Sequence, residues 1–335
     1  MSLKPISAAD LLAKPMPEPV PLLSPFLAEC GYTVVQAREK AGKTWAALGM
    51  AAAIAGGGTF LGGHCEQPRP VIYVDAENGE RRMRQRLRYM QGSIGDGDAV
   101  LAGKNLHILG AREHDDECGK NPFPVIDGGD GSLQYVDLVR EYGAALLIVD
   151  TKAKLTEYTD EKSAADDVAL SQTVRQVQAE GCALMVLHHI AQGRDAFDPT
   201  ASRGSTALPG SADLILGVKK QPKVDPEAVA HFRLASAEAR DGDEVDVTAE
   251  LAPDGDGWSW QTAEIGCVGR HGQDVDDVQR MMQVARTGGP YKRQSDLEQA
   301  LGWYQGKVSK VNKAAVKSGR LGAKEMEQAR LANPA

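Results

Sequence analysis

The sequence predicts an α/β fold in which a mostly parallel sheet is covered by helices on both faces. Apolar runs of four to eight residues alternate with longer helical runs between residues 32 and 189, and this alternation is typical of strands that are buried on both faces. Polar and charged side chains directly follow several of these runs. Because ligands of parallel sheets bind beyond the C-terminal strand ends, a ligand site is expected there.

The expected elements follow one another in a regular order. The β-branched run at residues 32–36 predicts a short buried strand, and the alanine-rich run at residues 45–57, which ends in glycine, predicts a capped helix. Further strands are expected within residues 70–79, 105–110, 144–150, 182–189, 213–218, 231–237, 246–251 and 257–261. Further helices are expected at residues 80–91, 132–143 and 165–181, with a loop at residues 112–131.

Composition divides the chain into three parts. Residues 1–25 hold six prolines and predict an irregular lead-in, and residues 26–265 form the main domain. The composition changes near residues 266–274, so residues 266–335 are expected to form a basic helical domain. From Arg286 onward there are 10 basic and 4 acidic residues, a net charge of +6, against −14 for the preceding 285 residues. A basic tail on an acidic body suggests contact with a polyanion, and the alternative is a solvated charged helix.

Several classes of protein are excluded by composition. No run approaches the roughly 18–20 apolar residues of a membrane helix, and the N-terminus carries acidic residues and prolines where a secretion signal has an unbroken apolar stretch. A cytoplasmic protein without membrane association is therefore expected. The five cysteines are scattered, odd in number and never in a Cys-x-x-Cys pair, which argues against a disulfide framework or a zinc ribbon.

Residues 37–44, AREKAGKT, match a phosphate-binding loop except at its first glycine, where Ala37 stands. Free N–H groups at the start of a helix bind phosphate, and Lys43 would reach the β- and γ-phosphates. The first glycine mainly eases the turn, so Ala37 is compatible with the loop if its φ is negative. The alternative is a chance GKT in an alanine-rich helix. The expected nucleotide contacts are Ala37, Lys40, Ala41, Gly42, Lys43, Thr44 and Trp45.

A second motif supports ATP and Mg²⁺ as the ligands. The apolar run ALLIV ends in Asp150 about a hundred residues after the loop, and in phosphate-loop ATPases such an aspartate holds Mg²⁺ through water, together with the loop threonine, here Thr44. The alternative for Asp150 is a helix cap or a turn aspartate. Because both motifs occur in the required order, the sequence favours an ATP site.

Three further side chains at strand ends are candidates for the chemistry. Glu77 follows the second strand and could act as the general base that polarises the attacking water, with Asp75 as its rival. His188 and His189 end the fifth strand, and one could sense the terminal phosphate. Since successive strand residues face opposite ways, one histidine is expected at the site and the other in the packing.

Together these residues resemble the RecA-like ATPase fold, and within it the plasmid RepA-type hexameric replicative helicases and their phage-borne relatives. The segments that carry the resemblance are AREKAGKT, VIYVDAENGERRMRQRL, ALLIVDT, a strand ending in LHH, and ASRGSTALPGSADLIL. The similarity spans residues 25 to 260, about 70% of the chain. It implies that Lys43, Thr44 and Asp150 hold MgATP, that Glu77 is the catalytic glutamate and that His188 or His189 is the sensor. It also implies that Arg203 is an arginine finger reaching a neighbouring subunit of the ring.

The sequence departs from this family pattern at two points. Ala37 replaces the first loop glycine, although relatives also vary there. Relatives commonly carry a lysine two residues before an asparagine in the strand after ILGV, whereas this chain offers Glu238 and Arg240. Arg240 could supply the positive charge, so activation of hydrolysis by a neighbouring subunit is less firmly indicated than ATP binding.

DNA contacts are expected in two regions. In a RecA-like ring the loops after the fourth and fifth strands face the channel, which makes Lys152, Lys154 and Arg194 candidates for single-stranded DNA, although the same loops contain acids. The tail predicts three helices, and Lys307, Lys310, Lys313 and Lys317 share one face of the last. This resembles a winged helix-turn-helix module that could bind duplex DNA, and the alternative is a basic helical cap or a protein-contact domain.

Three functions remain open on the sequence. The first is a ring-shaped motor that moves on single-stranded DNA and unwinds duplex in plasmid or phage replication. The second is an ATP-switched DNA-binding protein, such as a recombinase-like or annealing factor. The third is a regulatory ATPase that sits on DNA without unwinding it. The candidates Glu77, the histidines and Arg203 favour the motor, whereas the missing lysine and the acidic channel loops favour the other two.

Overall fold

The structure is a computed structural model of the whole chain. The residues it describes are 5–15, 21–90, 93–95, 97–110, 123–126, 129–156, 164–201, 211–239 and 244–265, with residues 281, 284–285, 291, 293–301, 308–309, 312, 327–328 and 331 of the tail.

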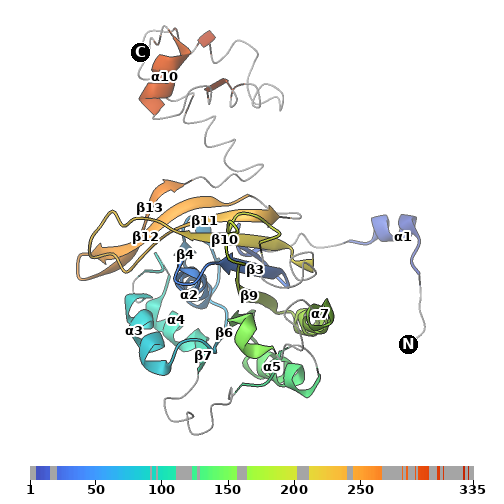
Figure 1. Cartoon of the computed structure of the whole chain (residues 1–335). Coiled ribbons are helices and arrows are strands. Elements are labelled where there is room, and N and C mark those ends of the chain that lie inside the picture. Colours follow the sequence, from blue (N-terminus) through green and yellow to red (C-terminus); the bar gives the residue numbers. More distant parts are fainter. Residues whose placement is uncertain are drawn as a thin grey trace.

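A nine-stranded sheet in the order β13-β12-β11-β10-β3-β9-β8-β6-β7 forms the centre of the molecule (Figure 1). The six strands from β10 to β7 pair in parallel, and β10 to β13 pair antiparallel. The parallel strands are β3 (Tyr32–Ala37), β6 (Val71–Asp75), β7 (Leu106–Gly110), β8 (Leu146–Asp150), β9 (Ala183–His189) and β10 (Leu214–Lys220). The others are β11 (Ala230–Ala239), β12 (Asp246–Asp254) and β13 (Gly257–Ile265), with the short pairs β1 (Pro21–Leu23) and β2 (Leu27–Ala28), and β4 (Thr59–Phe60) and β5 (Gly63–His64).

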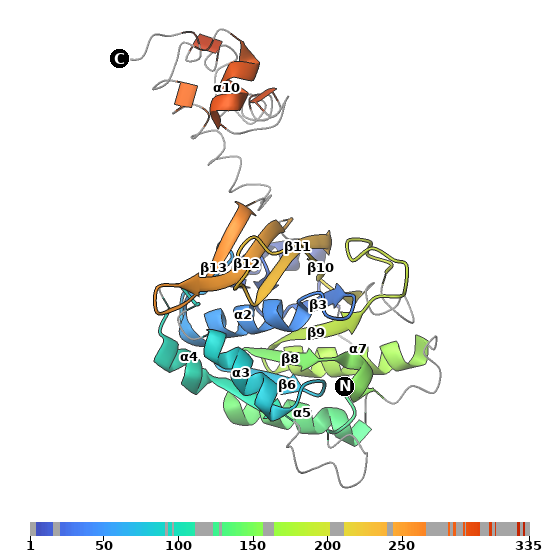
Figure 2. The same cartoon turned by 60° about the vertical axis from the view of Figure 1, so that its left-hand side comes forward.

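Helices cover both faces of the parallel strands (Figure 2). On one face lie α2 (Lys43–Gly56), α3 (Glu80–Met90) and α4 (Ala99–Asn105), and on the other lie α5 (Gly129–Tyr142) and α7 (Ala164–Ala179). The remaining described helices are α1 (Ala8–Ala13), α6 (Lys152–Leu155) and α10 (Gln294–Leu301).

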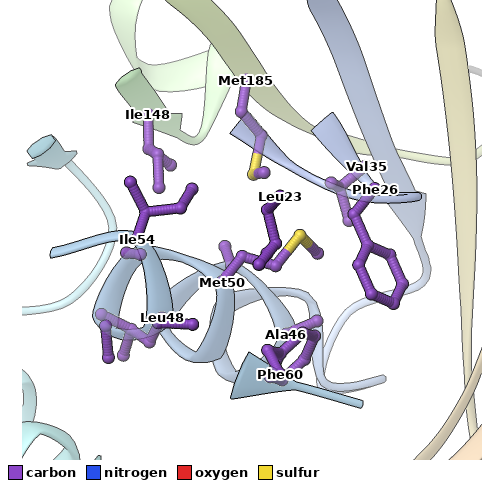
Figure 3. Close-up of a cluster of buried hydrophobic side chains, with 14 of the residues drawn as sticks. Leu23, Phe26, Val35, Ala46, Leu48, Met50, Ile54, Phe60, Ile148 and Met185 are labelled. Atoms are coloured by element: carbon purple, nitrogen blue, oxygen red, sulfur yellow. The ribbon is translucent and has the colours of Figure 1, made fainter. Parts of the chain in front are cut away.

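Side chains along each parallel strand alternate between two cores, because the side-chain period of a strand is two. Val35, Ile148 and Met185 pack with Met50 and Ile54 of α2 in the first core (Figure 3). The residues just before Val35, Ile148 and Met185, which are Val34, Leu147 and Leu184, belong to the second core with α5 and α7. This alternation decides which strand-end side chains face α2 and which face the opposite helices.

The antiparallel extension adds apolar cover to the α2 side of the sheet. Trp260 of β13 lies 5.3 Å from Phe60 and 5.6 Å from Phe232, ring centre to ring centre. All but two residues of α2 are buried. The alanine-rich composition of α2 suits this position, since small side chains let the helix lie close to the sheet on one side and to β4 on the other.

The predicted α/β fold is confirmed, and each expected strand is present within a few residues of its expected bounds. The lead-in expected to be irregular contains α1 and β1, and α4 and α6 lie where no element was expected. Helix α5 begins at Gly129 rather than 132, while much of the expected loop at 112–131 lies outside the described residues. Most of residues 266–335 also lies outside them, so the winged-helix expectation stays a prediction. Within the described part of the chain, no helix is both long and apolar enough to span a membrane.

Candidate active site

The polar strand ends meet at one edge of the sheet because the parallel strands end in register. Ala37 of β3 is paired with His189 of β9, and Asp75 of β6 is paired with Asp150 of β8. Strand β9 lies between β3 and β8. The phosphate-loop motif and the aspartate motif are therefore separated by a single strand, and α2 starts directly above them.

The loop between β3 and α2 has the backbone that its sequence predicts. Ala37 is the last, buried residue of β3 and is not among the non-glycine residues with positive φ, so no glycine is needed there. Gly42, the N-cap of α2, has φ +113°, and a Cβ at this position would lie 2.8 Å from Cδ1 of Phe232. Only glycine satisfies both constraints. Lys40 also adopts a positive φ, +58°, a conformation that concentrates at functional sites in non-glycine residues.

Lys43 lies buried under the loop at the start of α2. Its Nζ lies 3.5 Å from the carbonyl oxygen of Ala37, 3.3 Å from that of Arg38, and 3.2 Å from Nδ1 of His189. Burial lowers the pKa of Lys43, and the carboxylates of Asp150, Glu77 and Glu39 oppose this effect. The ammonium is therefore held by carbonyl dipoles and nearby acids at the N-terminus of a 14-residue helix, where free N–H groups favour an anion.

Asp150 is fully buried and is held by two hydroxyl groups. Its Oδ2 accepts hydrogen bonds from Thr44 Oγ1 at 2.8 Å and from the Tyr73 hydroxyl at 2.7 Å. Its Oδ1 is buried without a hydrogen-bond partner. Burial raises the pKa of Asp150 to about 6, with added repulsion from Asp75 and Glu77, while the two hydroxyl donors lower it.

This donor set fits a magnesium ion. Mg²⁺ takes hard oxygen ligands and usually keeps several waters, and a buried carboxylate oxygen without a hydrogen-bond partner beside a threonine hydroxyl offers such ligands. A divalent cation would also favour the ionised form of a carboxyl group whose pKa burial has raised. Thr44 and Asp150 are therefore placed as the sequence predicts for holding the ion.

The two rival acids at the end of β6 differ in what they contact. Asp75 is buried, and its Oδ1 accepts hydrogen bonds from the backbone and side chain of Asn78 at 2.8 and 3.0 Å and from Glu77 N at 3.3 Å. Asp75 therefore closes the turn after the strand. Glu77 is exposed, and its Oε2 lies 3.8 Å from Nε2 of His189. Of the two acids, Glu77 is the one that can reach a water molecule in the cleft.

The two histidines separate as strand geometry requires. His189 faces the α2 side, between Lys43 and Glu77, whereas His188 is buried at 3% exposure beside Gln36, its register partner on β3. Gln36 itself points away from α2 and donates to the carbonyl oxygens of Ala196 and Asp198 at 2.9 and 2.8 Å. The structure thus brings His189, and not His188, to the candidate site.

A pocket of about 320 Å³, here called the P-loop pocket, opens beside these residues. It is lined by residues 40–45, by Glu77 and Asn78, by Arg82 and Arg86 of α3, by Lys223 of the β10–β11 connection and by His231 near the start of β11. Arg86 stacks over Trp45 with its Cζ 5.5 Å from the ring centre. An adjacent pocket is also lined by Tyr89. It shares with the P-loop pocket the residues Trp45, Arg82, Arg86, Lys223 and Val229. This room and this charge suit a triphosphate with its base.

Some predicted residues do not join the site. Arg203, Arg240, Lys307, Lys310, Lys313 and Lys317 lie outside the described residues. Lys152 is buried at 2% exposure because it begins the short helix α6, so its ammonium is not at the surface where the sequence placed it. Lys154 and Arg194 are exposed, and Arg194 forms an ion pair with Asp198 at 3.3 Å. Of the three expected channel contacts, the structure leaves two at the surface.

Sequence reasoning missed several residues that shape the site. Tyr73 faces Asp150 from the neighbouring strand, and its place two residues before Asp75 could have indicated the shared face. Arg82 and Arg86 are one helical turn apart, a spacing that could have placed both on one side of α3. His231 and Glu250 form a buried pair at 3.1 Å, and the Glu250 oxygens accept from Val224 N and Asp225 N, which positions the β10–β11 connection. No local signal in the sequence indicates that pair.

The chain is similar to one described protein family and to solved structures. The family model described as an AAA domain matches residues 2–195, more than half of the chain. Among solved structures, a KaiC-like protein from the hyperthermophilic archaeon Pyrococcus horikoshii OT3 is similar with a TM-score of 0.46 and 14% sequence identity, over 73% of this chain and 99% of that chain. No curated protein matches the sequence.

Proposed function

Because this chain belongs to the AAA domain family and has a RecA-like P-loop ATPase core, we propose that it hydrolyses ATP to drive movement on single-stranded DNA. The observation that carries the ATPase part of the proposal is the convergence of Lys43, Thr44, Asp150, Glu77 and His189 at one sheet edge. A RepA-type replicative helicase, acting as a hexameric ring in plasmid or phage replication, is the specific form that the sequence resemblance favours. In such a ring Arg203 would reach the site of the neighbouring subunit.

The positions of the residues support a division of labour. The N–H groups at the start of α2 and the Lys43 ammonium would bind the β- and γ-phosphates of ATP, and Thr44 and Asp150 would hold Mg²⁺. The bound ion would neutralise charge that develops on the phosphate oxygens. Glu77 orients water for in-line attack and accepts its proton.

His189 lies between the other two polar groups of the site. An ammonium group only donates, so Nδ1 of His189 is placed to accept from Lys43 at 3.2 Å. Its Nε2 lies 3.8 Å from Oε2 of Glu77. His189 thus connects the lysine that binds phosphate to the acid that orients water, as a sensor of the terminal phosphate would.

The substitution Lys43→Ala tests the site. Loss of the cation is expected to reduce ATP hydrolysis by roughly 100-fold or more, as when a donor to a developing charge is removed. Lys104→Ala, on the exposed face of α4, is the matched control and should retain the wild-type rate. An unchanged rate in Lys43→Ala would disprove the assignment.

A second candidate function is an ATP-switched DNA-binding protein without unwinding activity. The burial of Lys152 and the pairing of Arg194 with Asp198 favour it, because both reduce the positive charge available on the expected channel loops. A forked-duplex unwinding assay separates the candidates. Strand separation that depends on ATP supports the motor, whereas ATP-dependent DNA binding without separation supports the switch.

A further inference from the structure

Another, larger pocket lies beside the phosphate-binding loop, on the side away from Thr44 and Trp45. This basic pocket, of about 570 Å³, is lined by residues 38–41 of the loop, by Ile190 and residues 193–196 after β9, and by Val218, Lys219 and Lys220 at the end of β10. Lys40, Ala41 and Lys220 line both this pocket and the P-loop pocket. The two pockets therefore share a wall.

The charge of the basic pocket is strongly positive in a protein whose net charge is −8. Its five cations are Arg38, Lys40, Arg194, Lys219 and Lys220, all exposed, against the two lining acids Glu39 and Asp195. Arg194 also pairs with Asp198 outside the lining, at 3.3 Å. Asp195 is partly neutralised, because its carboxylate lies 3.2 Å from Lys219 Nζ and accepts from Phe197 N. Arg38, Lys40 and Lys220 form no ion pair with other described residues. The pocket can therefore attract more than one anionic group.

The walls of the pocket are held in place before any ligand arrives. The buried Gln36 amide fixes the carbonyls of Ala196 and Asp198, and Ala191 N donates to Ala201 O at 2.9 Å. Phe197 lies beneath Arg233 and Lys219, at 4.7 and 5.9 Å from their cationic groups. A preformed pocket binds without first ordering its own loop, which lowers the entropic cost of binding.

The chemistry of the lining indicates which anion it takes. Among the described residues, no aromatic side chain lines the pocket, and the apolar lining consists of alanine, isoleucine and valine, so these residues offer a base no ring on which to stack. We infer that the basic pocket binds backbone phosphates of single-stranded nucleic acid. This inference rests on the proposed action on DNA and adds a binding site to it.

Arg38 gives this site a direct connection to the ATP site. Its side chain lines the basic pocket, while its carbonyl oxygen accepts from Lys43 Nζ at 3.3 Å. A DNA backbone phosphate that binds the Arg38 guanidinium therefore contacts a residue whose carbonyl oxygen accepts from Lys43. Lys43 is the lysine proposed to bind the phosphates of ATP. Coupling between sites is reciprocal, so DNA should change ATP affinity by the same factor by which ATP changes DNA affinity.

The test is a salt titration of DNA affinity in the full-length protein. Binding of a fluorescent oligothymidylate is followed by anisotropy for wild type, for the double variant Arg194→Gln/Lys219→Gln, and for Lys104→Gln as a remote control in which a single positive charge is removed. Each phosphate contact on a single strand contributes about 0.7 to the slope of log K against log salt. The double variant should therefore lose about 1.4 from the slope and bind roughly 25-fold more weakly near 0.1 M salt, and Lys104→Gln should match wild type.

A variant that removes a negative charge separates the effect of charge on DNA affinity from the effect of structural damage. Asp195→Asn keeps an acceptor for Phe197 N but removes a negative charge from the pocket, so it should bind DNA more tightly. Weaker binding by Asp195→Asn, or an unchanged slope in the double variant, would overturn the inference. Displacement of the oligonucleotide by inorganic phosphate at constant ionic strength would also overturn it, since the pocket would then be a site for small anions.

The proposed ATPase function is measured separately, as DNA-free ATP hydrolysis that Lys43→Ala removes. If wild type hydrolyses ATP but does not bind the oligonucleotide, the inference fails while the ATPase assignment stands. If hydrolysis is absent but the salt slopes change as expected, the site is supported and the proposed motor fails.

Discussion

The Tyr73 hydroxyl donates a 2.7 Å hydrogen bond to Oδ2 of Asp150, the oxygen that also accepts from Thr44. Both hydroxyl groups therefore act on one carboxylate oxygen and leave Oδ1 without a partner. Burial raises the pKa of Tyr73 well above its usual value, and the Asp150 carboxylate raises it further, so the phenol stays a donor. Tyr73 thus fixes the orientation of the carboxylate that is placed to hold magnesium.

Tyr73→Phe should weaken magnesium binding while leaving the fold intact. A hydrogen bond to a charged group contributes about 1.5–3 kcal/mol. The loss expected here is therefore about 10- to 100-fold in the Mg²⁺ concentration needed to bind a nonhydrolysable ATP analogue. Calorimetric titration of the analogue at several Mg²⁺ concentrations measures this. Tyr135→Phe removes a 2.7 Å hydrogen bond to Pro124 on the opposite side of the sheet and should not alter the magnesium dependence. Equal behaviour of the two variants would contradict the role given to Tyr73.

Gly42→Ala should lower the stability of the protein by more than the cost of backbone strain in the phosphate-binding loop alone. A left-handed conformation costs an alanine about 1–2 kcal/mol, and the new methyl group would also lie 2.8 Å from the Phe232 ring. Gly62→Ala is the matched control, because Gly62 has φ +83° but nothing within 4 Å of its would-be Cβ. Urea unfolding should show the larger loss of stability in Gly42→Ala, and ATP affinity should fall in that variant only. Similar losses in both would mean that the contact with Phe232 does not matter.

His189→Gln and His188→Gln should have different effects. His189 lies between Lys43 and Glu77, so its substitution should lower kcat by about 100-fold, the lower end of the range typical of positioned acid–base groups, with little change in stability. His188 is buried on the other face, so its substitution should lower the free energy of unfolding by about 1–3 kcal/mol and leave kcat near wild type. Steady-state kinetics and urea unfolding of both variants decide this, and the reverse result would assign the sensor to His188.

Deletion of residues 270–335 should reduce DNA affinity and flatten its salt dependence while leaving ATP binding intact. The slope should fall by about 0.7–0.9 for each phosphate that the tail neutralises in the wild-type complex. Replacing Lys307, Lys310, Lys313 and Lys317 together by glutamine keeps the chain length and should reproduce most of the effect. If the slope of the deletion variant equals that of wild type, the tail does not bind the DNA.

The fold could be predicted from the sequence because apolar runs and helical runs alternate so regularly. The same regularity located Lys43, Asp150 and Glu77, since strand ends of a parallel sheet share an edge. Choosing His189 over His188 needed one further fact, namely that α2 covers the face shared by Ile148 and Met185. That fact depends on the packing of the helix and not on any local pattern.

The features that sequence missed depend on contacts between distant segments. Tyr73 donates a hydrogen bond to Asp150 only because β6 and β8 are neighbours in the sheet. The sequence of one strand does not indicate which other strands lie beside it. Lys152 was expected to contact DNA because the loop after the fourth strand faces the channel in a RecA-like ring, yet the Lys152 side chain is buried at the start of α6. The basic pocket joins residues near positions 40, 195 and 220, whose proximity follows from β10 pairing with β3.

The side-chain amide of Gln36 donates to the carbonyl oxygens of Ala196 and Asp198, which lie 160 and 162 residues further along the chain. These hydrogen bonds fix the segment after β9 to β3, the strand that precedes the phosphate-binding loop. The contact closes a long stretch of chain, and closing a long loop costs more conformational entropy than closing a short one. We therefore expect this edge of the sheet to form later in folding than contacts between sequence neighbours.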